Sequence, residues 1–265
     1  MTPFQSAILG VIQGATEFLP VSSSGHLRLA EHYMGFTGSS TLFDLYLHMA
    51  TLIAVLMFFY RPVLKVLKGL AWPILRNTAQ AEESREGLRL AGLILLSAIP
   101  SGILGVLWGH KLENLSDSVV FVGVNMVING FILLSILLTR KRRIFSLTWK
   151  SALIVGFAQC LGILRGISRS GSTITAGLHA GLDPEEAGTF SFLLFVPTVV
   201  GAFLLELLKS KGSPEPFPIL ATGFIAALVT GLIALKVVMS LLRRGSLYWF
   251  GLYTLALGIV IIVVG

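Results

Sequence analysis

The stretch Leu19-Pro20-Val21-Ser22-Ser23-Ser24-Gly25 interrupts an apolar segment that runs from Phe4 to Phe36. A second break, Gly166-Ile167-Ser168-Arg169-Ser170-Gly171, interrupts the segment from Leu147 to Leu182. Such breaks are tolerated at membrane depth only where protein buries them or where they line a wet cavity. They are also the sequence feature that best marks a binding site in repeat-built membrane proteins. We therefore expect the two breaks to form the functional site.

The composition of the whole chain is too apolar for a water-soluble protein. Of its 265 residues, 54% are hydrophobic and 12% are charged, whereas soluble domains carry about 25% charged residues. These proportions exclude a soluble enzyme and a disordered chain. The single cysteine, Cys160, excludes a disulfide framework and a multi-cysteine metal site.

Six further segments are long and apolar enough to cross ~30 Å of hydrocarbon. They are Leu42–Tyr60, Leu88–Gly109, Val119–Leu138, Ala187–Leu208, Ile219–Leu242 and Leu247–Val264. The segment Arg61–Leu90 is basic and amphipathic, which predicts an interfacial helix and a loop. The sequence therefore predicts an all-α integral membrane protein with a single membrane domain over residues 1–265.

The two breaks also resemble each other in sequence. When the chain is shifted by 146 positions, identical residues coincide: Gly10 with Gly156, Gln13 with Gln159, Ser22 with Ser168, Ser24 with Ser170, Gly25 with Gly171 and Gly35 with Gly181. This predicts an internal repeat, over about residues 1–140 and about 146–265. If each break forms a re-entrant helical hairpin, three spans separate the hairpins, so the second repeat is inverted relative to the first. The predicted fold is six transmembrane helices plus two re-entrant hairpins in an inverted-topology repeat.

The basic residues predict an orientation. The net charge is +7, and most Lys and Arg side chains lie in the loops after the first, third and fifth predicted spans. The positive-inside rule places those loops in the cytoplasm, so the first hairpin opens to the outside and both termini lie outside. Because this pattern is typical of membrane orientation and not of a DNA-binding face, we expect no nucleic-acid partner.

Three ionisable residues, Glu17, His26 and Arg169, lie in or beside the breaks, and ionisable groups at membrane depth are functional candidates by default. Hydroxyl and backbone N–H donors at a helix start bind anions, and the arginine fork matches phosphate oxygens. A hydroxyl near a histidine offers a nucleophile and a base, and a carboxylate can hold a divalent cation or position water. The pattern indicates phosphoryl transfer or phosphate binding.

A simpler interpretation stays open for each of these residues. Ser22–Gly25 can merely cap the helix that follows. Arg169 can pair with Glu17 only to hold the repeats together, and His26 can be a buried histidine with satisfied hydrogen bonds. For His48, inside the first predicted span, we favour a packing or hydrogen-bonding role.

The stretch Gln13–His26 resembles the first signature of the bacterial undecaprenyl-diphosphate phosphatase family (UppP or BacA, the bacitracin-resistance proteins), and Gly166–Thr173 resembles the second. Phe190–Leu194 with Pro197 resembles a third shared stretch. The resemblance implies an inner-membrane enzyme that removes the terminal phosphate from undecaprenyl diphosphate, yielding the lipid carrier of cell-wall precursors. It also implies an active site that faces the periplasm and activity supported by a divalent cation, Mg²⁺ or Ca²⁺.

The resemblance further implies roles for individual residues. Ser23 matches the proposed nucleophile, His26 the base or the nucleophile itself, Glu17 a catalytic acid and metal ligand, and Arg169 the phosphate-binding arginine. The implied substrate-binding residues are Gln13, Ser22, Ser24, Gly25, Ser168, Ser170, Gly171 and Thr173. Gln13 stands where many members have Glu, and an amide cannot act as an anionic ligand, which argues against a two-carboxylate metal site. Arg165 stands where the family usually has proline.

An inverted-repeat transporter or a polyprenyl-phosphate flippase is the alternative that the same repeat allows. A carrier needs no nucleophile, so phosphate release without a gradient separates the two hypotheses. The expected partners are the polyprenyl diphosphate substrate and membrane lipid. The sequence leaves the oligomeric state open, including a homodimer.

Overall fold

The computed structural model describes residues 1–35, 41–75, 81–115, 118–139, 146–209 and 215–264, and within these ranges it contains helices and no strand. The helices are α1 (Pro3–Phe18), α2 (Ser23–Tyr33), α3 (Thr41–Phe58), α4 (Tyr60–Leu75), α5 (Ala81–Leu115), α6 (Val119–Leu134), α7 (Trp149–Gln159), α8 (Arg169–His179), α9 (Pro184–Lys209), α10 (Phe217–Arg243) and α11 (Tyr248–Val264). Two short 3₁₀ helices, η2 (Ser135–Leu138) and η3 (Cys160–Ile163), extend α6 and α7. The all-α prediction is confirmed for these residues.

Four of the predicted spans correspond to helices that are long and apolar enough to cross a membrane: Ala81–Gly109, Val119–Leu138, Pro184–Leu208 and Phe217–Arg243. Among the described residues a fifth span exists only if α3 and α4 are taken together, and these two helices meet at an angle of 87°. The last predicted span is α11, an apolar helix of 17 residues. The chain is thus a multi-pass membrane protein.

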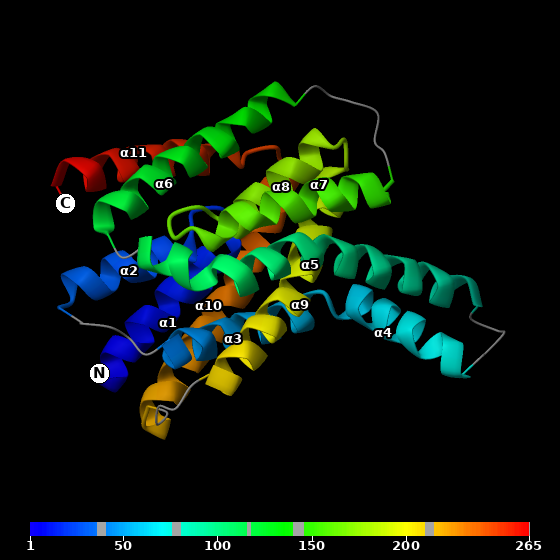
Figure 1. The fold of residues 1–265 in the computed structure, drawn as a ribbon, viewed down its shortest axis with the longest axis horizontal. Coiled ribbons are helices and arrows are strands. Elements are labelled where there is room, and N and C mark those ends of the chain that lie inside the picture. The colour runs from blue at the N-terminus through cyan, green and yellow to red at the C-terminus, as the bar shows by residue number, and fades with distance from the viewer. Residues whose placement is uncertain (36–40, 76–80, 116–117, 140–145, 210–214, 265) are drawn as a thin grey trace.

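The segment predicted as an interfacial helix and a loop is helical on both sides of residues 76–80, which lie outside the described residues. Helix α4 occupies its first part, and α5 begins at Ala81 rather than at Leu88. Acidic residues in the first turn of α5 favour a helix start, and Glu83 and Glu86 pair with Lys68 and Lys65 of α4. Helix α4 and the N-terminal part of α5 run side by side and project from the rest of the molecule, while the remainder of α5 contacts α7 and α9 (Figure 1).

The two broken segments are built alike. Helix α1 is followed by α2 as α7 and η3 are followed by α8, and α2 and α8 begin and end 146 positions apart. The N-caps correspond as well. Thr2 and Thr148 each form a capping box, and the side chains of Ser22 and Ser168 each accept a hydrogen bond from the backbone N–H of the glycine three residues later. Equivalent caps therefore set the starts of equivalent helices.

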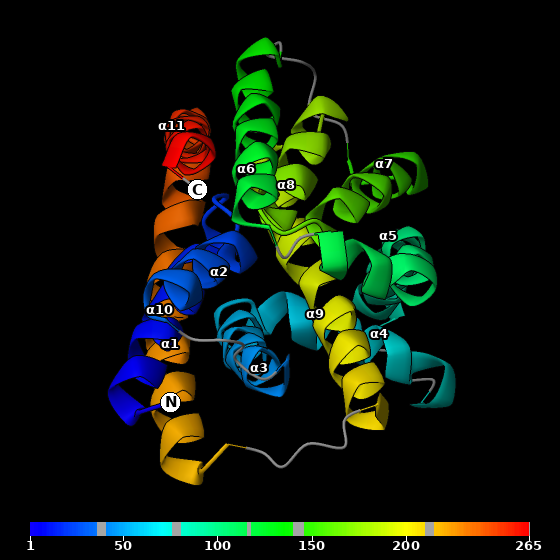
Figure 2. The same cartoon turned by 60° about the vertical axis from the view of Figure 1, so that its left-hand side comes forward.

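Glycines let the helices of the interior approach closely. Gly10 and Gly14 of α1 face the backbone of α10, where a Cβ at either position would collide with Gly223 or Ala227. Gly123 of α6 and Gly258 of α11 face each other in the same way, and Figure 2 shows these two helices side by side. Such small-residue contacts are the usual basis of helix packing in membranes.

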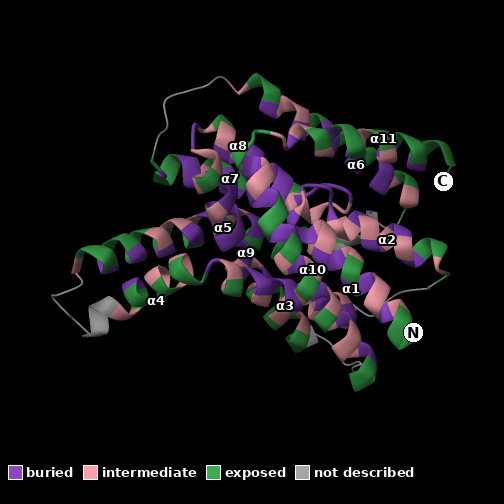
Figure 3. Cartoon of the chain, turned by 180° about the vertical axis from the view of Figure 1, so that it is seen from behind, coloured by how far each residue is buried: buried purple, intermediate pink, exposed green. Residues whose placement is uncertain are grey.

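The buried side chains concentrate at the centre of the molecule, where Figure 3 shows purple segments of several helices converging. Phe18, Phe192 and Phe195 form edge-to-face ring pairs there. Large apolar side chains on α5, α6 and α11 are exposed instead, as expected for surfaces that face lipid. The breaks lie within the buried centre, because Val21, Ser22, Ile167 and Ser168 are almost fully enclosed.

Candidate active site

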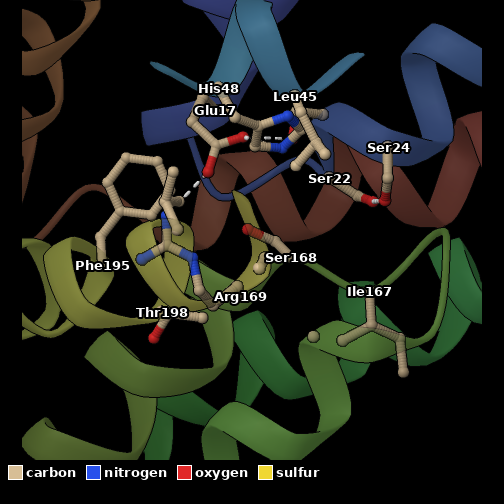
Figure 4. Close-up of a pocket in the computed structure, with 14 residues that line it drawn as sticks. Glu17, Ser22, Ser24, Leu45, His48, Ile167, Ser168, Arg169, Phe195 and Thr198 are labelled. Carbon is tan, nitrogen blue, oxygen red and sulfur yellow. Dashed lines mark hydrogen bonds and ion pairs between the residues drawn. The ribbon is translucent and has the colours of Figure 1, made fainter. Parts of the chain in front are cut away.

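A cavity of about 220 Å³ lies where the two breaks meet (Figure 4). Its lining comes from both breaks and from α3 and α9: Glu17, Ser22, Ser23, Ser24, Leu45, His48, Gly162, Ile167, Ser168, Arg169, Phe195, Thr198, Val199 and Ala202. Helices α2 and α8 both begin in this wall. Because the first N–H groups of a helix have no helical acceptor and carry partial positive charge, two helix N-termini make the cavity attractive to an anion.

Glu17, at the end of α1, is the centre of the polar network. Its carboxylate accepts hydrogen bonds from Arg169 Nη2 at 2.7 Å, from Ser23 Oγ at 2.5 Å and from Gln13 Nε2 at 3.0 Å. The side chain of Glu17 is only 5% exposed. A buried carboxylate is costly unless it is paired and hydrogen-bonded, and these three donors stabilise it. The structure thus brings the predicted residues Gln13, Ser23 and Arg169 into contact with Glu17.

Arg169 combines a structural contact with a free donor. Its guanidinium pairs with Glu17, and its Cζ atom lies 4.1 Å from the centroid of the Phe195 ring. Gly162 makes room for this position, because a Cβ there would lie 2.7 Å from the Cβ of Arg169. The Nη1 atom of Arg169 is buried and has no hydrogen-bond partner in the described part of the chain. The ion pair therefore holds the breaks together, as the simpler interpretation has it, and still leaves a donor for an anion.

Ser22 and Ser168 cap the two helices that begin at the cavity. Ser22 Oγ accepts from Gly25 N at 3.3 Å and from Gly166 N at 3.1 Å, so it also joins the first break to the second. Ser22 has φ 72°, a left-handed conformation that is uncommon for residues other than glycine. The capping interpretation is confirmed for Ser22, and its left-handed, bridging geometry sets the position of the neighbouring Ser23.

Asn129 of α6 ties the breaks together and was not singled out from the sequence. Its Oδ1 accepts from Ser168 N at 2.9 Å, and its Nδ2 donates to Pro20 O at 3.0 Å. Asn125, one turn earlier, donates to Arg165 O at 2.8 Å. Two asparagines one turn apart inside an apolar span are the signal that was available, since polar side chains in such helices hydrogen-bond to neighbouring segments.

The two histidines differ in their relation to the cavity, and His48 has the hydrogen-bonding role that the sequence favoured, with Nδ1 2.8 Å from Asp44 O. His26 does not line the cavity: its Nδ1 lies 2.8 Å from Ser22 O and its Nε2 lies 2.8 Å from Tyr253 Oη. Because a carbonyl only accepts, Nδ1 carries the proton, and Nε2 of a neutral ring accepts from Tyr253. His48 lines the cavity instead, with Nε2 3.6 Å from a Glu17 carboxylate oxygen. Ser23 is therefore hydrogen-bonded to Glu17 and not to His26.

The other predicted residues support the site from behind. Ser170 Oγ lies 3.0 Å from Ser168 Oγ, and Thr173 Oγ1 lies 2.5 Å from Ser191 Oγ. Gly25 and Gly171 donate their N–H groups to the capping serines. Ser24 is the one member of this group that lines the cavity itself. Of the residues predicted to bind substrate, Ser22, Ser24 and Ser168 line the cavity, and contact with substrate stays a prediction.

A metal site made of side chains alone does not fit this geometry. The described residues contain no group of three His, Cys, Asp or Glu side chains that could hold a metal ion. Glu17 is the only carboxylate in the cavity wall, and its oxygens already accept from three donors, one of them the cationic Arg169. The Gln13 side chain adds an amide where an anionic ligand would stand.

The arrangement suits phosphoryl transfer. A serine hydroxyl bonded to a carboxylate can be activated as a nucleophile, and an arginine with two helix N-termini can stabilise the charge of a phosphoryl group. The hydroxyl, the carboxylate, the arginine and the two helix N-termini lie around one cavity.

Comparison with known proteins agrees with this chemistry. Residues 6–260 match the family model described as bacitracin resistance protein BacA. A protein of Desulfatibacillum aliphaticivorans named undecaprenyl-diphosphatase is 39% identical over 97% of this chain and 96% of its own length. Proteins with the same name from Desulfosudis oleivorans and Korarchaeum cryptofilum are 39% identical over 100% of this chain and 99% of theirs, and 38% identical over 97% of both.

Proposed function

The chain belongs to the bacitracin resistance protein BacA family and hydrolyses undecaprenyl diphosphate, and we propose that it does so in the cavity between the two breaks, with Ser23 as nucleophile and Glu17 as its base. The observation that carries the assignment is the 2.5 Å hydrogen bond from Ser23 Oγ to the Glu17 carboxylate in a cavity lined by Arg169. The products are undecaprenyl phosphate and phosphate.

In the first step Glu17 takes the proton of Ser23 as Oγ attacks the terminal phosphorus. The Oγ–P bond forms and the bond from phosphorus to the bridging oxygen breaks, so that undecaprenyl phosphate leaves with the proton returned by Glu17. Arg169 Nη1 and the first N–H groups of α2 and α8 stabilise the equatorial oxygens during transfer.

In the second step Glu17 deprotonates a water molecule, which attacks the phosphoserine. The P–Oγ bond breaks, Ser23 regains its proton from Glu17, and phosphate is released. His26 takes no proton in this scheme, because its Nε2 faces Tyr253 and its Nδ1 faces the Ser22 carbonyl. His26 positions the start of α2 instead.

We propose further that a Mg²⁺ or Ca²⁺ ion required by the reaction is carried by the phosphate oxygens of the substrate. Support comes from the absence of a three-ligand cluster among the described residues and from the occupied oxygens of Glu17. Mg²⁺ commonly binds through substrate phosphates and few carboxylates. Chelation should then abolish turnover, while the purified substrate-free protein retains no stoichiometric metal by elemental analysis.

For the topology we propose six spans and two re-entrant hairpins in an inverted repeat, in a cytoplasmic membrane with the cavity opening to the outer side. The identical bounds of α2 and α8 after a shift of 146 support the repeat. The basic residues near α4 and after α10 support the orientation. A homodimer stays a prediction.

The test is phosphate release from undecaprenyl diphosphate by the purified protein in detergent micelles, where no gradient exists. We expect release by the wild type and a loss of at least about 10³-fold in kcat for Ser23→Ala, since the nucleophile is absent. Ser135→Ala is the matched control, because Ser135 hydrogen-bonds to Ile132 and His179 away from the cavity. Full turnover by Ser23→Ala would exclude Ser23 as nucleophile.

A further inference from the structure

A second cavity, of about 520 Å³, lies beside the first between α5, η3 and α9. Its wall is almost entirely apolar and includes Leu95, Ile99 and Val106 from α5 and Leu205 from α9. These four side chains are also exposed on the outer surface of the molecule. The second cavity, which we call the α5–α9 groove, is therefore open toward the surface that faces lipid.

The α5–α9 groove adjoins the active-site cavity. Gly162, Arg169, Thr198 and Ala202 line both spaces. Arg169 stands at the junction, with Glu17 and the serines on one side and apolar side chains on the other. A polar, anion-attracting cavity and an apolar groove thus adjoin each other at Arg169.

Three glycines leave the groove unfilled. Gly102 and Gly105 of α5 and Gly201 of α9 line it, and a Cβ added at any of them would meet no atom within 4 Å. These glycines therefore do not serve helix packing, in contrast to Gly10 and Gly14, whose missing side chains let α1 contact α10. Glycine in a helix interior costs roughly 0.5–1 kcal/mol relative to alanine, and here the cost is not offset by a packing contact.

We propose that the α5–α9 groove binds the head-proximal isoprene units of the substrate, with the remainder of the prenyl chain in the lipid. The inference rests on the proposed function. A polyprenyl diphosphate has two parts that match the two adjoining cavities. It has a charged diphosphate head and, attached directly to it, an apolar chain of isoprene units. Pockets of about 300–1,000 Å³ enclose ligands of drug size, so the groove holds several units but not a long chain.

The α5–α9 groove lies at the second break, where Gly162 and Arg169 line it. At the first break α1 packs on the backbone of α10 through Gly10 and Gly14, and at the second break α7 packs on the backbone of α5 through Gly156, which matches Gly10. The position that matches Gly14 after the shift of 146 is Cys160, where α7 tightens into η3 and the chain turns away through Gly162. The α5–α9 groove lies beyond the contact of α7 with α5 and adjoins Arg169.

The test fills the groove without touching the polar cavity. Gly102→Leu and Gly201→Leu place a side chain into it from opposite walls, and Gly92→Leu is the matched control, since Gly92 is an exposed α5 glycine with equally open surroundings outside the groove. Steady-state kinetics are measured with undecaprenyl diphosphate and with a five-carbon prenyl diphosphate. We expect KM for undecaprenyl diphosphate to rise at least about tenfold in both groove variants while kcat changes less than about threefold, and Gly92→Leu to match the wild type.

The short substrate separates the groove from the reaction itself. Its KM should change less than about threefold in the groove variants, since its single isoprene unit ends at the junction and it lacks the following units that would occupy the groove. Equal KM values for undecaprenyl diphosphate in Gly102→Leu, Gly201→Leu and Gly92→Leu would overturn the inference and leave the proposed function intact. A wild type that hydrolyses neither substrate would overturn the proposed function instead.

Photolabelling gives an answer that does not depend on the variants folding. A prenyl diphosphate with a photoreactive group on its second isoprene unit is irradiated with the wild-type protein, and labelled peptides are identified by mass spectrometry. We expect labels on α5 and α9 that an excess of undecaprenyl diphosphate suppresses. Labels confined to α1, α2 or α10 would contradict the groove.

Discussion

The two breaks share one backbone design but carry different chemistry. After the shift of 146, Ser22 matches Ser168 and Gln13 matches Gln159, so caps and helix starts correspond. At the positions that touch the cavity, however, Glu17 matches Ile163 and Ser23 matches Arg169. The first break thus supplies the carboxylate and the hydroxyl, and the second supplies the cation. The comparison teaches that the duplicated backbone provides two helix N-termini, while divergence of a few side chains turns them into a reactive site.

The largest expected effect comes from removing the negative charge of Glu17, since the second break has no carboxylate at the matching position, Ile163. Glu17→Gln keeps the shape of the side chain but removes the base, and general-base catalysis contributes about 10²–10⁴-fold. We expect kcat for undecaprenyl diphosphate to fall by that amount, measured by phosphate release. The amide also leaves Arg169 without its ion partner, so thermal unfolding in detergent should be measured alongside. A variant that keeps its kcat would show that another group accepts the proton of Ser23.

Changing the cation of the second break should have a smaller effect. Arg169→Lys keeps the charge but loses the planar fork and the contact with the Phe195 ring. We expect a loss of about 10²-fold in kcat, comparable with removal of one charge-stabilising donor. Arg165→Lys is the control, because Arg165 does not line the cavity. Equal rates for wild type and Arg169→Lys would argue against an oriented contact between the guanidinium and phosphate.

Removing the hydrogen bonds that join the two breaks should lower the thermal stability of the protein. Asn129→Leu leaves the Ser168 N–H and the Pro20 carbonyl without their partner, and an unsatisfied buried polar group costs about 1–3 kcal/mol. We expect a lower Tm in detergent than for Asn125→Leu, which removes one hydrogen bond to Arg165 O. If both variants melt at the same temperature, Asn129 does not join the breaks in the way the structure indicates.

The smallest expected effect concerns His26. Tyr253→Phe removes the hydroxyl that donates to His26 Nε2, and a single hydrogen bond contributes about 0.5–1.5 kcal/mol. We therefore expect a decrease in kcat of about tenfold or less. If His26 were the base for Ser23, the same change would free Nε2 and raise the rate, so an increase would favour the histidine over Glu17.

Local patterns in the sequence were sufficient for much of the fold and part of the site. Apolar runs predicted helices that the structure contains, and the breaks with Glu17, Ser23 and Arg169 were expected to converge, as they do. The extent of α5 was underestimated, because pairing of Glu83 and Glu86 with lysines of α4 extends the helix into a charged stretch that hydropathy excludes. His48 and Asn129 were not assigned to the site, because nothing local distinguishes them from polar residues that pack within a span.

The sequence by itself determined the class of the protein, the position of the two breaks and the kinds of side chain available there, since these depend on composition and on short-range spacing. Only the tertiary structure decided which side chain faces which. Glu17, and not His26, is hydrogen-bonded to Ser23 because the left-handed turn at Ser22 and the cap of α2 direct Ser23 toward the end of α1. Likewise, the groove at Arg169 lies between α5 and α9, where an added Cβ on Gly102, Gly105 or Gly201 would meet no atom within 4 Å. The placement of helices from distant parts of the chain around such a space is not encoded in any single segment.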